Sequence, residues 1–135
     1  MKLTEALVWQ RYLKPALLRG FRVESSTYTG IPDVFGILPD GRAVWIENKI
    51  VPSEGSDLLN YLRPGQSTFR KEYSPSIPVI VLGAVRPGKS PYSIFVANVA
   101  YANKSPRTFV ARCDNYPTAC QKIINDIAME LNQWH

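Results

Sequence analysis

The chain has 135 residues, 45% of them hydrophobic, and its 16 Lys and Arg against 11 Asp and Glu give a formal net charge of +5. This length predicts one domain over residues 1–135. No apolar run approaches the ~20 residues of a membrane span, and the single His, at position 135, excludes a His-based zinc site. The N-terminus lacks a signal-peptide core, which favours the cytoplasm, and the positive charge fits a polyanionic partner.

The N-terminal part of the chain shows one helix pattern followed by one strand pattern. Residues 4–19 predict an amphipathic helix with Thr4 as its N-cap and Gly20 at its end. Residues 21–27 predict a strand that leads into a stretch rich in hydroxyl side chains. These hydroxyl groups either contact phosphate oxygens or satisfy the hydrogen-bonding groups of an edge strand. The candidate residues are Ser25, Ser26 and Thr29.

A β-hairpin is predicted over residues 31–50. The first strand covers 31–38 and ends at the turn signal Pro39-Asp40-Gly41, and the second strand follows from residue 42. Because side chains alternate along a strand, Glu47 and Lys49 should share one face while Asn48 points to the other. A turn at 39–41 brings Asp33 opposite residues 47–49.

The chain after the hairpin alternates between helical and strand patterns. Residues 66–73 predict a helix in which basic and aromatic residues interleave, a pattern that suits a nucleic-acid backbone, although such a helix also buries its aromatic face. Residues 78–84 predict a strand covered on both faces, and residues 85–91 a basic loop. The basic residues expected to contact a phosphate backbone are Arg63, Arg70, Lys71, Arg86 and Lys89.

Two paired strands, at 92–99 and 107–113, and a closing helix at 115–132 complete the predicted elements. The whole order indicates an α/β fold with a mixed central β-sheet flanked by helices.

Two carboxylates and a lysine on one face of an apolar hairpin are costly to bury without a partner. A divalent cation is the natural partner for Asp33 and Glu47, because Mg²⁺ prefers carboxylate oxygens and binds substrate phosphates. Lys49 could then orient a metal-bound water or neutralise charge on a phosphate. This chemistry is phosphodiester hydrolysis with Mg²⁺ or Mn²⁺.

Pro32-Asp33, followed after thirteen residues by Glu47-Asn48-Lys49, resembles the signature of the PD-(D/E)xK nuclease superfamily. Thr29-Gly30-Ile31 and Trp45-Ile46-Glu47 are most similar to virus-type replication-repair nuclease (VRR-NUC) domains and Holliday-junction resolvases. The resemblance covers residues 1 to about 85. It implies a restriction-endonuclease-like fold and a metal-dependent DNA endonuclease.

The resemblance also implies roles for individual residues. Asp33, Glu47 and the backbone carbonyl of Asn48 would bind the metal, and Lys49 would position the attacking water. Glu5 matches an early-helix glutamate near the metal, although a first-turn glutamate is also favoured by the helix dipole. Gln66 matches a glutamine that approaches the same site, or is simply a polar helix residue.

Several functions remain open at this stage. The short chain suggests recognition of branched or junction DNA, or a homodimer whose two sites cut two strands. Stand-alone family members of this size resemble phage proteins, which implies a bacterial or phage-infected host cytoplasm. The alternatives are a homing or restriction enzyme that reads sequence through residues 85–113, a non-catalytic nucleic-acid-binding module, and an RNA-directed nuclease.

Overall fold

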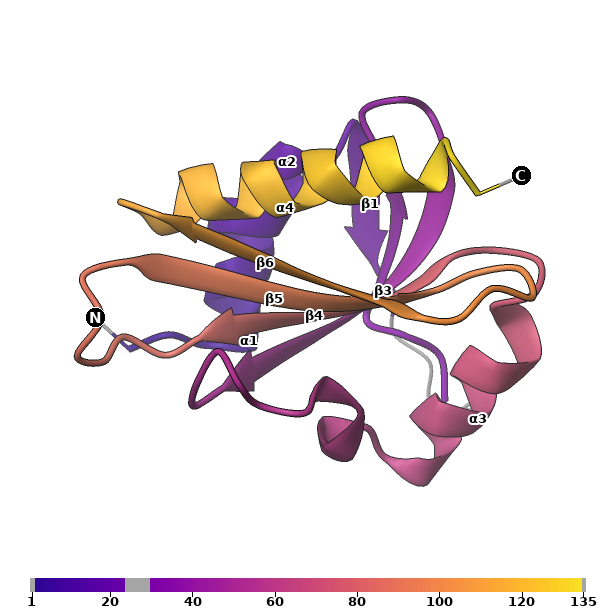
Figure 1. Ribbon diagram of the computed structural model, residues 1–135, viewed down its shortest axis with the longest axis horizontal. Coiled ribbons are helices and arrows are strands. Elements are labelled where there is room, and N and C mark those ends of the chain that lie inside the picture. Colours follow the sequence, from indigo (N-terminus) through magenta and orange to yellow (C-terminus); the bar gives the residue numbers. More distant parts are fainter. Residues whose placement is uncertain (1, 24–29, 135) are drawn as a thin grey trace.

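The computed structural model describes residues 2–23 and 30–134 and has a six-stranded mixed sheet at its centre (Figure 1). The strands lie in the sheet in the same order as in the chain. β3 and β4 run parallel, and the other neighbouring strands pair antiparallel. The strands are β1 (Arg19–Arg22), β2 (Val34–Ile37), β3 (Ala43–Val51), β4 (Val79–Val85), β5 (Ser93–Ala100) and β6 (Arg107–Cys113). The predicted α/β class is therefore confirmed.

Helices cover both faces of this sheet. α4 (Tyr116–Leu131) and the N-terminal helical segment pack on one face, whereas α3 (Pro64–Tyr73) and the short 3₁₀-helix η2 (Leu58–Tyr61) lie on the other (Figure 1). α4 begins at Asn115, whose side chain accepts a hydrogen bond from the Thr118 backbone N–H at 2.8 Å. Its apolar stripe is fully buried and includes Ile123, Ile124 and Ile127.

The N-terminal helical segment is shorter than predicted. It consists of α1 (Glu5–Val8), a π-helical turn η1 (Trp9–Leu13) and α2 (Lys14–Ala16). The predicted cap is confirmed, because the Thr4 side chain accepts a hydrogen bond from the Leu7 backbone N–H at 3.1 Å. The helix ends at residue 16 because Leu17 is extended, so β1 begins at residue 19, earlier than predicted. The rest of the predicted first strand, from residue 24 to 27, lies outside the described residues.

The predicted hairpin is confirmed in its turn and register. The Leu38 N–H donates to the Arg42 carbonyl at 2.8 Å, and Gly41 adopts a φ of 93°, which glycine tolerates without strain. β2 pairs with β3 so that Val34 faces Ile46. Asp33, the residue before Val34, therefore lies opposite Glu47.

The helix between β3 and β4 is longer than predicted. α3 begins at Pro64, two residues before the predicted start, since a proline in the first helical turn loses no intrahelical hydrogen bond. The crossover through η2 and α3 is what allows β3 and β4 to run parallel. β4 is buried at every position, as predicted. No helix among residues 2–23 and 30–134 is long and apolar enough to cross a membrane.

Tyr116 ties α4 to the sheet. Its hydroxyl donates to the Val85 carbonyl at 2.5 Å, and its side chain is buried. We expect Tyr116→Phe to lower the free energy of unfolding by about 1–3 kcal/mol, because the buried carbonyl loses its donor. Urea denaturation measures this loss, and Tyr92→Phe, at a residue 50% exposed, should leave the midpoint unchanged. An equally stable Tyr116→Phe protein would show that this hydrogen bond is not needed.

Candidate functional site

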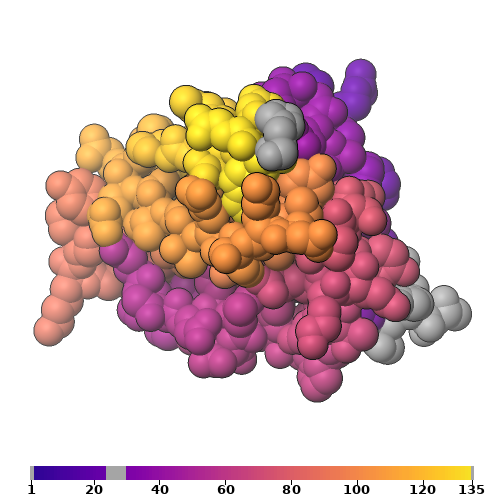
Figure 2. All heavy atoms as spheres, turned by 45° about the vertical axis from the view of Figure 1, so that its right-hand side comes forward, coloured from indigo at the N-terminus to yellow at the C-terminus, as the bar shows by residue number. Residues whose placement is uncertain are grey.

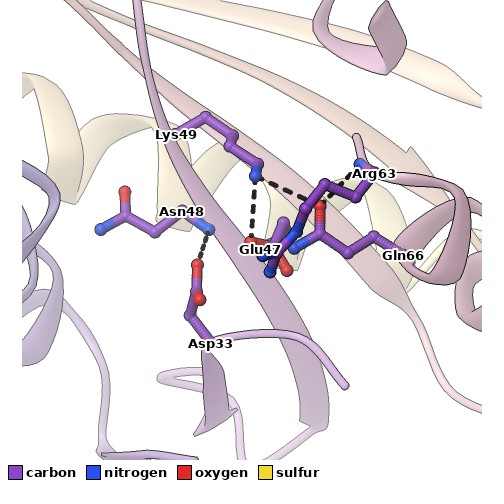
Figure 3. A network of polar contacts seen from close by, with 6 residues as sticks. All are labelled: Asp33, Glu47, Asn48, Lys49, Arg63 and Gln66. Carbon is purple, nitrogen blue, oxygen red and sulfur yellow. Dashed lines mark hydrogen bonds and ion pairs between the residues drawn. The ribbon is translucent and has the colours of Figure 1, made fainter. Parts of the chain in front are cut away.

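Asp33, Glu47 and Lys49 meet where the β2–β3 ladder ends (Figure 3). Side-chain alternation along β3 places Glu47 and Lys49 on the same face, and Lys49 Nζ lies 3.5 Å from Glu47 Oε2. Asp33 reaches this point from the residue before β2. The hairpin thus brings together the three side chains as the sequence predicted.

Asn48 holds two segments in place around the carboxylates. Its backbone N–H, which lies beyond the last pair of the β2–β3 ladder, donates to Asp33 Oδ2 at 3.0 Å. Its side chain points to the opposite face, where Nδ2 donates to the Glu5 carbonyl at 3.0 Å. Asn48 therefore orients Asp33 and anchors the start of α1.

Gln66 approaches the site from the first turn of α3. Its Oε1 accepts hydrogen bonds from Lys49 Nζ at 3.2 Å and from the Arg63 backbone N–H at 2.9 Å (Figure 3). α3 is held against β3 by an edge-to-face contact between Phe69 and Trp45, whose ring centroids are 5.5 Å apart. Gln66 is thus fixed in position, and it orients the lysine.

Glu47 is buried in a way that disfavours its charge. Its side chain is nearly inaccessible, with the residue 3% exposed. Burial, followed by the hydrogen bond and negative charge of Asp33, raises the pKa of Glu47 to about 8, against the opposing effect of Lys49. The raised pKa favours the protonated form of Glu47 when no cation is bound, which weakens its ion pair with Lys49. Glu47 Oε1 is buried and has no hydrogen-bond partner among residues 2–23 and 30–134.

Glu5 lies at the rim of this cluster, in the first turn of α1. Partial burial of its carboxyl group and the nearby charge of Asp33 raise the pKa of Glu5, whereas Lys49, Arg22 and Arg63 lower it. These influences place Glu5 within electrostatic range of the site, as the sequence predicted. Arg22, at the end of β1, was not predicted to lie here, because its position depends on the pairing of β1 with β2.

The arrangement fits a divalent cation with few protein ligands. No group of three or more His, Cys, Asp or Glu side chains comes together closely enough to hold a metal among the described residues. A cation would therefore be held by Asp33 and Glu47, with water and the Asn48 carbonyl as further ligands, as suits Mg²⁺. The unpartnered Glu47 Oε1 supplies a free ligand atom, and a cation would compensate the cost of ionising this carboxyl group.

The basic residues expected to contact a phosphate backbone do not form one surface. Arg63 borders the carboxylate cluster, while Arg70 turns toward β5, where its Nη2 donates to Asn98 Oδ1 at 2.8 Å, and Lys71 lies exposed beside it. Arg86 and Lys89 lie in the loop after β4, at the other end of the sheet from α3 (Figure 1). Ser25, Ser26 and Thr29 lie outside the described residues.

No protein-family model matches this chain, and no curated protein matches it. Among solved structures, it is similar to a ribosomal subunit interface protein from Coxiella burnetii, with 15% sequence identity and a TM-score of 0.38 over 66% of this chain and 94% of that chain. A likeness at this TM-score does not transfer properties of that protein to this chain.

The predicted membership of the PD-(D/E)xK superfamily is corrected: no protein-family model matches the chain, and the solved structure that it resembles is described as a ribosomal subunit interface protein and not as a nuclease. The prediction of a DNA endonuclease is corrected together with the family. This correction includes the branched-DNA, sequence-specific and binding-module alternatives, the phage context, and the DNA and homodimer partners. The physical reason is that the signature is short. A strand–turn–strand unit with a few polar residues fixes local geometry, and the same local geometry can arise in unrelated chains.

Proposed function

We propose that this chain is a hydrolase that cleaves phosphate esters at a divalent-cation site formed by Asp33 and Glu47. The observation that carries the proposal is the buried, unpartnered Oε1 of Glu47, in a carboxyl group that faces both Asp33 and Lys49. A buried carboxyl group beside a second, half-buried carboxyl group is unfavourable with one lysine as the only neighbouring cation among the described residues, and a divalent cation would compensate both carboxyl groups. Mg²⁺ or Mn²⁺ bound there would polarise a phosphoryl oxygen and lower the pKa of a bound water.

Lys49 carries the second part of the proposed chemistry. Its ammonium group is held between Glu47 Oε2 and Gln66 Oε1, and its side chain is 15% exposed. An ammonium group fixed in a site largely closed to water can stabilise negative charge that develops on a phosphate oxygen. Gln66 and Asn48 are positioning residues in this proposal, since one orients Lys49 and the other orients Asp33.

Hydrolysis of bis(p-nitrophenyl) phosphate and of p-nitrophenyl phosphate tests the proposal. We expect turnover with Mn²⁺ or Mg²⁺, none with EDTA, and a loss of at least about 100-fold in Asp33→Asn, because loss of groups that only support a metal ligand already costs 10- to 100-fold. Asp114→Asn makes the same chemical change at an exposed residue and should retain full activity. Absence of turnover in a folded wild-type protein that binds Mn²⁺ would overturn the hydrolase proposal.

Lys49→Met separates charge stabilisation from cation binding. The substitution keeps an unbranched, apolar side chain and removes the ammonium group. We expect kcat to fall by about 10²- to 10³-fold, while the dissociation constant for Mn²⁺, measured by isothermal titration calorimetry, stays within about threefold. Loss of Mn²⁺ binding together with activity would contradict the assigned role, because Lys49 would then be needed to assemble the site.

A further inference from the structure

A pocket with a basic lining lies between α3 and the segment that joins β5 to β6. Figure 2 shows residues 100–106 beside α3, and the Ala102 N–H donates to the Ser74 carbonyl at 2.9 Å. The pocket has a volume of about 390 Å³, which lies in the range of small-molecule sites. It is large enough for a small organic ligand.

One stripe of α3 faces this pocket. Ser67, Arg70, Lys71 and Ser74 all line it, and their spacing of three and four residues places them on one side of the helix. Lys104 contributes a third cationic side chain from the opposite wall. No Asp or Glu belongs to the lining within the described part of the chain.

No counter-charge pairs with Arg70 in the part of the chain that the structure describes. Its side chain is half-buried, and its Nη2 is bound by the neutral amide of Asn98 at 2.8 Å. Its Nε is buried without a hydrogen-bond partner, and none of the described carboxylates forms an ion pair with it. Burial lowers the pKa of the Arg70 guanidinium group. A partly buried cation without an ion-pair partner is costly, and an anion in the pocket would compensate that cost.

We propose that this pocket binds the phosphate group of a small organic molecule. Arg70, Lys71 and Lys104 approach from two walls, which suits a tetrahedral dianion with several acceptor oxygens. Leu59, Leu62 and Tyr101 also line the pocket and give the organic part of the ligand an apolar surface. Inorganic phosphate would use the cationic groups alone.

The pocket is distinct from the carboxylate cluster. Arg70 contacts Asn98 on β5, whereas Gln66, one helical turn earlier, contacts Lys49 on β3. β4 lies between these two strands in the sheet. Ligand binding here is therefore independent of the proposed hydrolase activity and is tested without a metal.

Phenyl phosphate and inorganic phosphate serve as the probes, titrated into ¹⁵N-labelled protein in EDTA at about 0.15 M salt, where nonspecific attraction is screened. We expect phenyl phosphate to shift the amide signals of residues 67–74 and 100–104 and the Nε–H signal of Arg70. It should bind more tightly than inorganic phosphate because only the former covers the apolar wall.

Matched variants decide whether the pocket itself is responsible. Lys104→Gln changes an exposed side chain, and we expect it to weaken phenyl phosphate binding by about tenfold, the loss typical of one charge-assisted hydrogen bond. Lys89→Gln removes the same charge from the loop after β4 and should leave binding unchanged. Equal weakening by both variants, or signal shifts confined to residues 33 and 47–49, would overturn the proposal, as would the absence of any shift.

Discussion

Glu47→Gln will make the cation-free protein more stable at about pH 8 and will remove most of its pH dependence between about pH 5 and 8. The pKa of Glu47 is raised from an ordinary value of 4.5 to about 8 in the folded protein, so the folded state binds more protons than the unfolded state in this range. Stability therefore falls as the pH rises toward the folded-state pKa. At about 1.4 kcal/mol per pKa unit, the full decline is roughly 3–5 kcal/mol.

Urea denaturation in EDTA at several pH values measures this effect. Glutamine has no proton to lose, so the variant should show only the shallow pH dependence of the remaining groups. Glu72→Gln, at an exposed residue of α3, is the matched control and should behave like the wild type. A wild-type stability that is constant between about pH 5 and 8 would contradict the prediction, because Glu47 would then ionise at no cost.

Divalent cations provide a second measurement on the same variant. Binding to ionised Glu47 must displace its proton, so the affinity for Mn²⁺ should rise by about tenfold per pH unit below about pH 8. Mn²⁺ should then restore the stability that the wild type loses as the pH rises, in proportion to the logarithm of its concentration. Glu47→Gln should show neither effect.

The local geometry of the site could be predicted from the sequence because it depends on short-range rules. A Pro-Asp-Gly turn fixes the hairpin, and the alternation of side chains in β3 then decides that Glu47 and Lys49 share a face. Thr4 was recognisable as a helix cap for the same reason. In each case the residues that interact lie close together in the chain or in one hairpin.

Features that depend on long-range packing could not be predicted in this way. Whether Arg86 and Arg63 share a surface depends on which end of the sheet each loop occupies, and that is decided by the crossover between β3 and β4. The hydrogen-bond partner of Arg70 likewise depends on tertiary packing, since Asn98 is 28 residues away. The family was misjudged for a related reason. A short motif determines local structure, but it does not establish that two proteins share an ancestor.

Gly30→Ala should be among the most damaging single substitutions near the site. A Cβ atom at residue 30 would lie 2.4 Å from the Gly65 carbonyl oxygen and 2.9 Å from its carbon. Both are backbone atoms, so no side-chain rotation relieves the overlap. Either the segment that leads to Asp33 or the first turn of α3 must move.

That movement would act on stability and on the site together. Overpacking of this kind costs about 1–3 kcal/mol, and Gly65 precedes Gln66, whose Oε1 holds Lys49 Nζ at 3.2 Å. We therefore expect a lower free energy of unfolding and a loss of phosphate-ester hydrolysis that persists at temperatures where the variant is fully folded. Gly55→Ala is the control, because a Cβ there meets nothing within 4 Å, and its stability should change by less than about 0.5 kcal/mol. If Gly30→Ala matched this control in urea denaturation and kept the wild-type amide shifts of residues 65–66, the close approach of the two glycines would not be what positions α3 against the hairpin.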